Sequence, residues 1–158
     1  MTGGFTMGKQ SVWKSYDQKE LKEVNAVCER YKTCLDAGKT ERECVTLAVE
    51  MAKEVGYKDL NVYIAEDKQL KTGDKVYAVW MHKMVALFQI GEEPISNGMN
   101  ILGAHIDSPR LDVKQNPLYE ADGFAYLDTH YYGGIKKYQW VAQPLALHGV
   151  AVLKSGKT

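Results

Sequence analysis

Residues 75–91 read KVYAVWMHKMVALFQIG and contain two runs of β-branched, aromatic and other apolar side chains. Each run has the composition and length of a β-strand. His82 lies between the two runs, where a turn with a solvated polar side chain is the ordinary expectation. These residues therefore predict two strands joined by a short connection, within a part of the chain that is rich in strands.

Two segments before these strands have the spacing of amphipathic helices. In residues 17–37, apolar side chains recur three and four positions apart, with Lys and Glu between them. They are Leu21, Val24, Cys28, Tyr31 and Leu35. Gly38 ends this first pattern. Thr40 and Glu43 then have the spacing of a capping box, which begins a second helical pattern that stops at Gly56.

Three further segments are expected to be extended. LNVYIAE at residues 60–66 and NILGAHI at residues 100–106 are apolar runs bounded by turn-type residues. HGVAVLKSG at residues 148–156 has the pattern of a strand that enters a Ser-Gly turn, but no return strand follows it. A lone strand leaves backbone groups unsatisfied, so we expect a fragment of a longer protein. The order of elements expected along the chain is therefore two helices followed by several strands.

The composition excludes several classes of function. The 158 residues are 45% hydrophobic and 25% charged, which is typical of a soluble globular protein. The formal net charge is +0, so neither a nucleic-acid nor a membrane partner is expected. The sequence lacks a spanning apolar run and a signal-peptide core, which predicts a cytoplasmic protein. Cys28, Cys34 and Cys44 are expected to be reduced residues on helix faces.

A histidine and an aspartate stand two positions apart in ILGAHIDSPRLDVK, residues 101–114. In an extended chain the side chains of His105 and Asp107 point the same way. If the apolar residues before them form a buried strand, the pair emerges at its carboxyl end, where ligands collect in α/β sheets. There an imidazole can bind a transition metal and a carboxylate can fix its tautomer. Such a pair is also common at surface strand ends, so spacing alone leaves both interpretations open.

The flanking sequence resembles a known family. The motifs GAHIDSPRLDVK, NPLY and THYYGGIKKYQWVAQPLALHG together are similar to those of the aspartyl aminopeptidase and aminopeptidase I family of dinuclear zinc metallopeptidases, particularly its bacterial members. The resemblance runs from about the first helix to Thr158. It implies that residues 1–112 are the N-terminal part of a zinc-exopeptidase-like α/β sandwich. Residues 113–158 would begin an inserted β-rich dimerisation domain.

The resemblance also implies an activity, which is the hydrolysis of N-terminal residues, acidic ones in some members, from a peptide substrate by a metal-activated water. His105 would be a metal ligand and Asp107 the catalytic carboxylate that orients it, with no further cofactor-binding residue. The complete site would hold two Zn²⁺, with Co²⁺ or Mn²⁺ as alternatives, in a homo-oligomer formed through the inserted domain.

Family members carry a bridging aspartate, a glutamate general base and their other ligands beyond the inserted domain. The chain by itself is therefore expected to be inactive. The alternative is a non-catalytic binding or assembly module that retains the fold without the chemistry.

Overall fold

The computed structural model describes residues 11–158, and contacts divide the chain after Ala37 into two units. The described part of the first unit contains the short helix η1 (Val12–Lys14) and the helix α1 (Gln18–Ala37). Asp17 and Glu20 bond reciprocally at the start of α1, because each carboxylate accepts the other residue's backbone N–H at 2.8 Å. The first predicted helix is confirmed.

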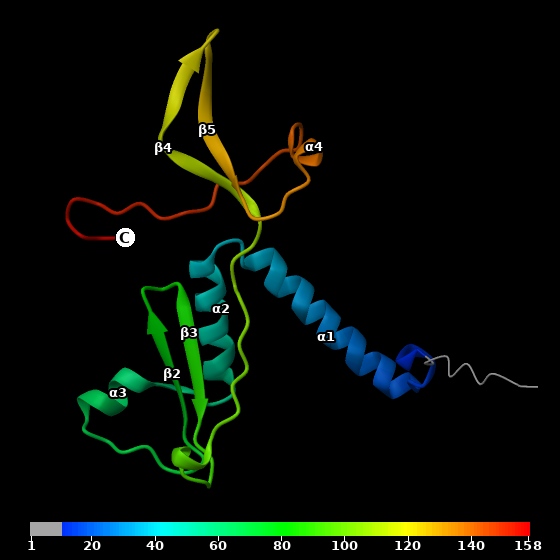
Figure 1. Cartoon of the computed structure of the whole chain (residues 1–158), viewed down its shortest axis with the longest axis vertical. Coiled ribbons are helices and arrows are strands. Elements are labelled where there is room, and N and C mark those ends of the chain that lie inside the picture. The colour runs from blue at the N-terminus through cyan, green and yellow to red at the C-terminus, as the bar shows by residue number, and fades with distance from the viewer. Residues whose placement is uncertain (1–10) are drawn as a thin grey trace, which may run out of the picture. The chain divides into compact units, whose positions relative to one another are not determined.

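The second unit begins with the helix α2 (Glu41–Glu54), whose N-terminus is fixed by the predicted capping box (Figure 1). The Thr40 hydroxyl accepts the Glu43 N–H at 3.3 Å, and the Glu43 carboxylate accepts the Thr40 N–H at 2.8 Å. These two bonds satisfy N–H groups that have no partner inside the helix. Gly56, with a φ of 91°, follows the end of α2 in the left-handed conformation that glycine adopts readily.

The predicted pair of strands forms a hairpin. The strands β2 (Lys75–Trp80) and β3 (Met84–Gln89) pair antiparallel, with Trp80 opposite Met84. Between them Met81 and His82 have φ values of 51° and 53°, so the predicted turn is confirmed. The short strand β1 (Lys58–Asp59) pairs parallel to β2 and completes a sheet of order β1-β2-β3.

The core of the described residues lies where α2 contacts β2 and β3 (Figure 1). Its buried apolar side chains come from α2 and β2 and are Val45, Ala52, Val76 and Tyr77. Lys53 of α2 places its ammonium group 5.9 Å from the centre of the Tyr77 ring. Val76 and Tyr77 are consecutive in β2 and point to opposite faces of the sheet. Buried side chains of α2 and of both faces of β2 therefore hold this part of the chain together.

The prediction of an extended segment at residues 60–66 is wrong, because α3 (Leu60–Ala65) is a helix. The carboxylate of Asp59 accepts the N–H of Asn61 at 2.9 Å and caps its N-terminus. A helix also suits the topology, since β1 and β2 are parallel and parallel strands need a crossover connection, which is usually a helix. Tertiary context has overridden the β-branched composition of this segment.

The strands predicted at residues 100–106 and 148–156 are also absent from the part of the chain that the structure describes. Residues 101–109 form no helix or strand, and the side chains of Ile101 and Leu102 are exposed. A strand needs a neighbour to pair with its backbone, and no described segment pairs with either of these two. The expected Ser-Gly turn is present, with a φ of 83° at Gly156.

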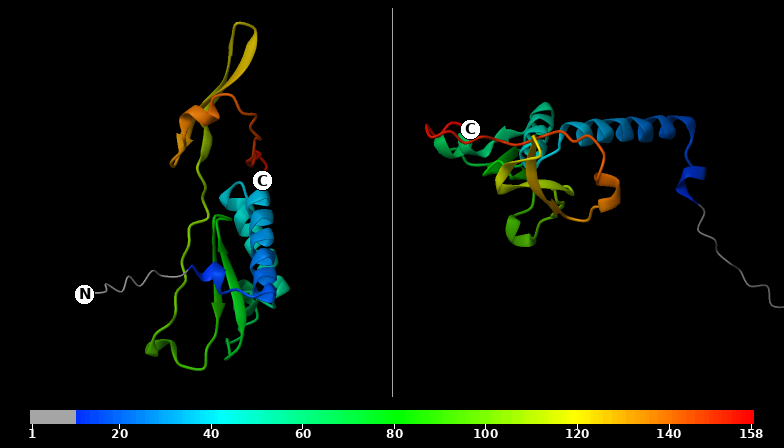
Figure 2. Two further views of the ribbon diagram at one scale, coloured as in Figure 1. Left: turned by 90° about the vertical axis from the view of Figure 1, so that its right-hand side faces the viewer. Right: turned by 90° about the horizontal axis from the view of Figure 1, so that it is seen from above.

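A long hairpin follows residues 101–109, formed by β4 (Arg110–Ala121) and β5 (Phe124–Tyr132). Figure 1 and the left view of Figure 2 show it as a twisted ribbon. Asp122 and Gly123 make its turn with positive φ values of 52° and 77°. The register shifts between Val113 and Leu118, where Pro117 cannot donate to the ladder. The helix α4 (Lys137–Trp140) comes next.

The predicted domain boundary between residues 112 and 113 falls within β4 and stays a prediction. The fold otherwise has the α/β character expected, and it begins with two helices before the first strand. Cys28 and Cys34 lie in α1 and Cys44 lies in α2, and the described residues form no disulfide bond. No helix among residues 11–158 has the length and apolar character needed to cross a membrane.

The last segment returns to the N-terminus of α2 through one polar contact. The Nδ1 atom of His148 lies 2.8 Å from the Glu43 carboxylate, which also takes part in the capping box. The hydrogen bond from His148 is the main reason why the pKa of Glu43 is lowered, and the backbone N–H groups of Lys39 and Thr40 add to it. The ionised carboxylate of Glu43 therefore accepts hydrogen bonds both from His148 and from the backbone at the start of α2.

We expect Val76→Ala to lower the free energy of unfolding by about 2 kcal/mol, since it removes two buried methyl groups and leaves a cavity. Val76 is 0% exposed, whereas Val62 of α3 is 50% exposed. Val62→Ala is therefore the matched control, and we expect it to change the free energy by less than about 0.5 kcal/mol. Urea unfolding followed by circular dichroism measures both, and equal effects would contradict the assignment of the core.

We expect the stability of the chain to fall with acid partly through Glu43. Because the pKa of Glu43 in the folded state lies below its ordinary value of 4.5, its contribution is fully present above that value and is lost as the pH falls through the lowered pKa. Glu43→Gln should flatten the decline of the free energy of unfolding over this range, and Glu50→Gln, an exposed change on the same helix, should not. Superimposable pH profiles for the wild type and Glu43→Gln would refute this expectation.

Candidate functional site

The side chains of His105 and Asp107 lie on the same side of the chain, as their spacing predicted. The Nδ1 atom of His105 is 3.1 Å from Oδ1 of Asp107 and 3.0 Å from the backbone oxygen of Asp107. Both neighbouring atoms are acceptors, so Nδ1 must carry the hydrogen. The contact therefore fixes the tautomer of the imidazole.

The other ring nitrogen of His105 is available for a ligand. Its side chain is 83% exposed, and no group among residues 11–158 bonds to Nε2. A neutral imidazole protonated at Nδ1 has its lone pair on Nε2, which is the form that binds a divalent metal. The arrangement fits the predicted role of a metal ligand, which stays a prediction.

Asp107 has a second side-chain partner that sequence reasoning missed. The Tyr132 hydroxyl donates to Oδ2 of Asp107 at 2.9 Å, across 25 positions of sequence. This bond is the main cause of the lowered pKa of Asp107, and it raises the pKa of Tyr132. Asp107 is therefore held as a carboxylate with one partner on each oxygen. No local pattern signals the Tyr132 contact, because it depends on the register of β4 and β5.

A charged cluster around Arg110 supports Tyr132. The Arg110 guanidinium lies 4.3 Å from the centre of the Tyr132 ring. It donates to Asp112 at 2.7 Å and pairs with Glu41 at 3.1 Å, and these three charged side chains are partly buried. Asp112 is the main cause of the raised pKa of Arg110, and Glu41 adds to it. Arg110 thus connects the first residue of α2 to β4 and β5.

The described residues do not form a complete metal site. No group of three or more His, Cys, Asp or Glu side chains within residues 11–158 is arranged to hold a metal ion. A tightly bound zinc ion needs at least three protein donors at about 2.0–2.3 Å. His105 fits as one of them, and Asp107 is used to orient it. His105 as a donor therefore stays a prediction, and the described part of the chain does not hold a complete site.

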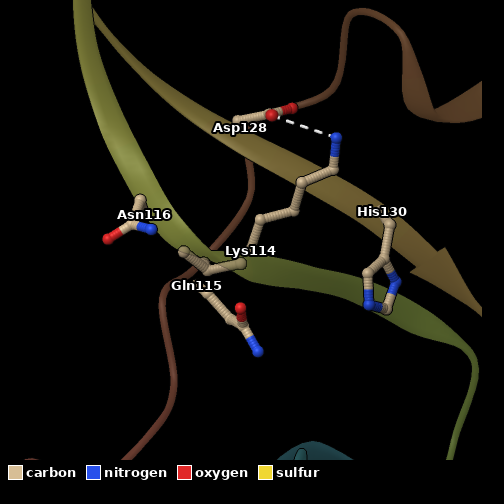
Figure 3. A pocket seen from close by; sticks show the side chains of 6 residues that line it. Lys114, Gln115, Asn116, Asp128 and His130 are labelled. Atoms are coloured by element: carbon tan, nitrogen blue, oxygen red, sulfur yellow. Dashed lines mark ion pairs between the residues drawn. The ribbon is translucent and has the colours of Figure 1, made fainter.

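A second feature is a solvent-open hollow at the irregular part of the β4–β5 hairpin, shown in Figure 3. Its volume is about 530 Å³, and it is lined by Val113, Lys114, Gln115, Asn116, Asp128 and His130. Lys114 spans the two strands to pair with Asp128 at 3.0 Å, and both side chains are half exposed. The charges of Lys114 and Asp128 compensate each other, so we assign no chemistry to the hollow.

The sequence of this chain matches a family model and the sequences of curated relatives. The model of the family described as "Aminopeptidase I zinc metalloprotease (M18)" matches residues 34–158. A curated relative from Clostridium acetobutylicum, named "Probable M18 family aminopeptidase 1", is 55% identical over 147 residues, which cover 93% of this chain and 32% of the relative. The chain thus spans about a third of the length of such relatives.

Two solved structures are similar in fold. The crystal structure of aminopeptidase I from Borrelia burgdorferi B31 matches with a TM-score of 0.84 and 40% identity, over 93% of this chain and 35% of that one. The crystal structure of the M18 aminopeptidase from Thermotoga maritima matches with a TM-score of 0.83 and 38% identity, over 96% of this chain and 32% of that one. The arrangement of helices and strands is therefore that of the N-terminal third of these enzymes.

We expect Arg110→Gln to lower the free energy of unfolding by about 1–2 kcal/mol, because partly buried hydrogen bonds between charged groups are lost and Glu41 and Asp112 lose their partner. Lys114→Gln breaks a half-exposed ion pair with Asp128 and serves as the control, with an expected change below about 0.5 kcal/mol. Thermal and urea unfolding of both variants measure the difference. If Lys114→Gln lowers the free energy of unfolding as much as Arg110→Gln does, the cluster around Arg110 contributes no more to stability than a half-exposed ion pair.

Proposed function

The chain belongs to the aminopeptidase I zinc metalloprotease family (M18), and from this premise we propose that it supplies the N-terminal third of a zinc-dependent aminopeptidase. The observation that carries the proposal is the fixed tautomer of His105. Its Nδ1–H is directed at two oxygens of Asp107, and Nε2 is left without a protein partner among the described residues. This arrangement of an oriented histidine is typical of a metal ligand.

In this proposal His105 binds a divalent metal through Nε2, and Asp107 fixes the ring and raises its basicity. The substrate is a peptide with a free N-terminus, and its first residue is released by hydrolysis. Zinc bound in a complete site polarises the scissile carbonyl and lowers the pKa of a bound water. We propose two Zn²⁺ per site, with Co²⁺ or Mn²⁺ as alternatives, and leave a preference for acidic N-terminal residues to be tested.

In this proposal the remaining donors come from outside the described residues, because no group of three or more His, Cys, Asp or Glu side chains among them is arranged to hold a metal ion. Support for this comes from the exposed apolar side chains of residues 101–109, such as Ile101 and Leu102. We propose that the segment predicted as a strand, residues 100–106, pairs with a strand of the rest of the enzyme. His105 then lies at the end of that strand, where ligands collect in α/β sheets.

We further propose a cytoplasmic homo-oligomer. Cys28, Cys34 and Cys44 form no disulfide bond among the described residues, which is usual in a reducing compartment. The β4–β5 hairpin exposes aromatic side chains, among them Phe124, Tyr119 and Tyr131, which are enriched at protein interfaces. The proposed oligomer forms through this hairpin and the domain that it begins.

We expect zinc-dependent aminopeptidase activity when residues 1–158 are joined to the remaining two-thirds of the Clostridium acetobutylicum relative. In this chimera His105→Ala should abolish the release of N-terminal residues, because a metal ligand is lost. His82→Asn is the control and should leave the rate unchanged, since His82 is exposed at a turn with a positive φ that Asn tolerates. Chromogenic substrates with N-terminal Glu, Asp or Leu measure both activity and preference.

Residues 1–158 alone should show no activity above background. Hydrolysis by the chain alone, or full activity of the His105→Ala chimera, would refute the proposal. A chimera that folds and self-associates but neither binds zinc nor hydrolyses peptides would instead establish a binding or assembly module.

A further inference from the structure

The carboxylate of Asp107 is held from two sides, and only one side belongs to the His-x-Asp motif. Oδ1 lies 3.1 Å from Nδ1 of His105, and Oδ2 accepts the hydroxyl of Tyr132 at 2.9 Å. Residues 101–109 have no strand partner among the described residues, so the backbone there does not fix this carboxylate by itself. The hydroxyl of Tyr132 is the contact that ties Asp107 to a regular element.

Tyr132 is itself held firmly at the end of β5. It pairs in register with Arg110, the first residue of β4. The Arg110 guanidinium covers one face of its ring at 4.3 Å and is held in turn by ion pairs at 2.7 Å and 3.1 Å. Gly133 follows with a φ of 73°, and a Cβ placed there would lie 3.4 Å from Pro109. The end of β5 therefore packs closely on the residues that follow the motif.

We propose that Tyr132 is a positioning residue for the metal site, whose hydroxyl holds Asp107 so that Oδ1 receives the Nδ1–H of His105. This inference deepens the proposed function and rests on it, because the site that Tyr132 serves is the proposed zinc site. The chain of contacts runs from Tyr132 to Asp107 to His105 and leaves Nε2 as the nitrogen that binds metal. Without the hydroxyl, the carboxylate loses one of its two side-chain partners and can turn away from the imidazole.

The first test uses the 158-residue chain and needs no metal. Long-range ¹H–¹⁵N spectra of the neutral imidazole of His105 report which nitrogen carries the hydrogen. In the wild type the Nδ1–H tautomer should dominate, and Tyr132→Phe should raise the Nε2–H form. The phenylalanine keeps the ring beneath Arg110, so folding is preserved. Tyr126→Phe, also on β5 and stacked on Tyr119 at 5.2 Å, is the matched control and should resemble the wild type.

The second test measures zinc affinity in the chimera by competition with a chromogenic chelator. Tyr132→Phe should weaken zinc binding about tenfold, the lower end of the range for a partner that orients a metal ligand. Tyr126→Phe should leave the affinity unchanged, and both variants should keep the wild-type melting temperature. A loss of affinity that is the same in both variants would show a general packing effect and would overturn the inference.

Failure of the inference can be told apart from failure of the proposed function. If the wild-type chimera binds zinc and hydrolyses peptides but Tyr132→Phe matches it in tautomer and in affinity, only the role of Tyr132 is refuted. If the wild-type chimera neither binds zinc nor hydrolyses peptides, the proposed function is refuted, and with it the role of Tyr132 at a metal site. The tautomer measurement would then still show whether Tyr132 orients Asp107.

Discussion

Burial of apolar side chains of α2 and β2 is the interaction on which the packing of α2 on the sheet of β2 and β3 depends. Among the described residues the buried apolar side chains come from α2 and β2 alone. The capping box at Thr40 and Glu43 sets where α2 begins, and this start places Glu41 next to the charged cluster of Arg110. The capping box therefore fixes the start of α2. At this start, Glu41 pairs with Arg110, the first residue of β4.

From this ion pair a set of polar contacts leads to the candidate site. Arg110 joins Glu41 to β4 and β5 and covers the ring of Tyr132, which binds Asp107. Asp107 fixes the Nδ1–H tautomer of His105. Each contact is modest by itself, because a net hydrogen bond contributes about 1 kcal/mol. Together they give a definite geometry to a motif that lies outside any strand.

The candidate site is also defined by what the described residues do not contain. A single oriented histidine cannot hold zinc tightly, since a stable site needs several protein donors. The curated relatives are about three times as long as this chain, and their length leaves room for the other donors. The exposed apolar side chains of residues 101–109 and the missing strand partners fit the same explanation.

Local patterns were sufficient for several features of this protein. The periodicity of α1, the capping box of α2 and the turn at His82 all follow from contacts within a few positions, and the structure confirms them. The family resemblance rested on motifs that are also local. The pairing of His105 with Asp107 was predicted for the same reason, because neighbouring side chains alternate in an extended chain.

Tertiary structure alone decided the rest. The β-branched segment at Leu60 became a helix because the parallel pairing of β1 and β2 requires a crossover. Residues 100–106 did not become a strand, because a strand forms only where another segment satisfies its backbone. Tyr132 reaches Asp107 across 25 positions, and the register of β4 and β5 sets that approach. Local geometry in the sequence determined that His105 and Asp107 meet, and the folded chain determined what holds them in place.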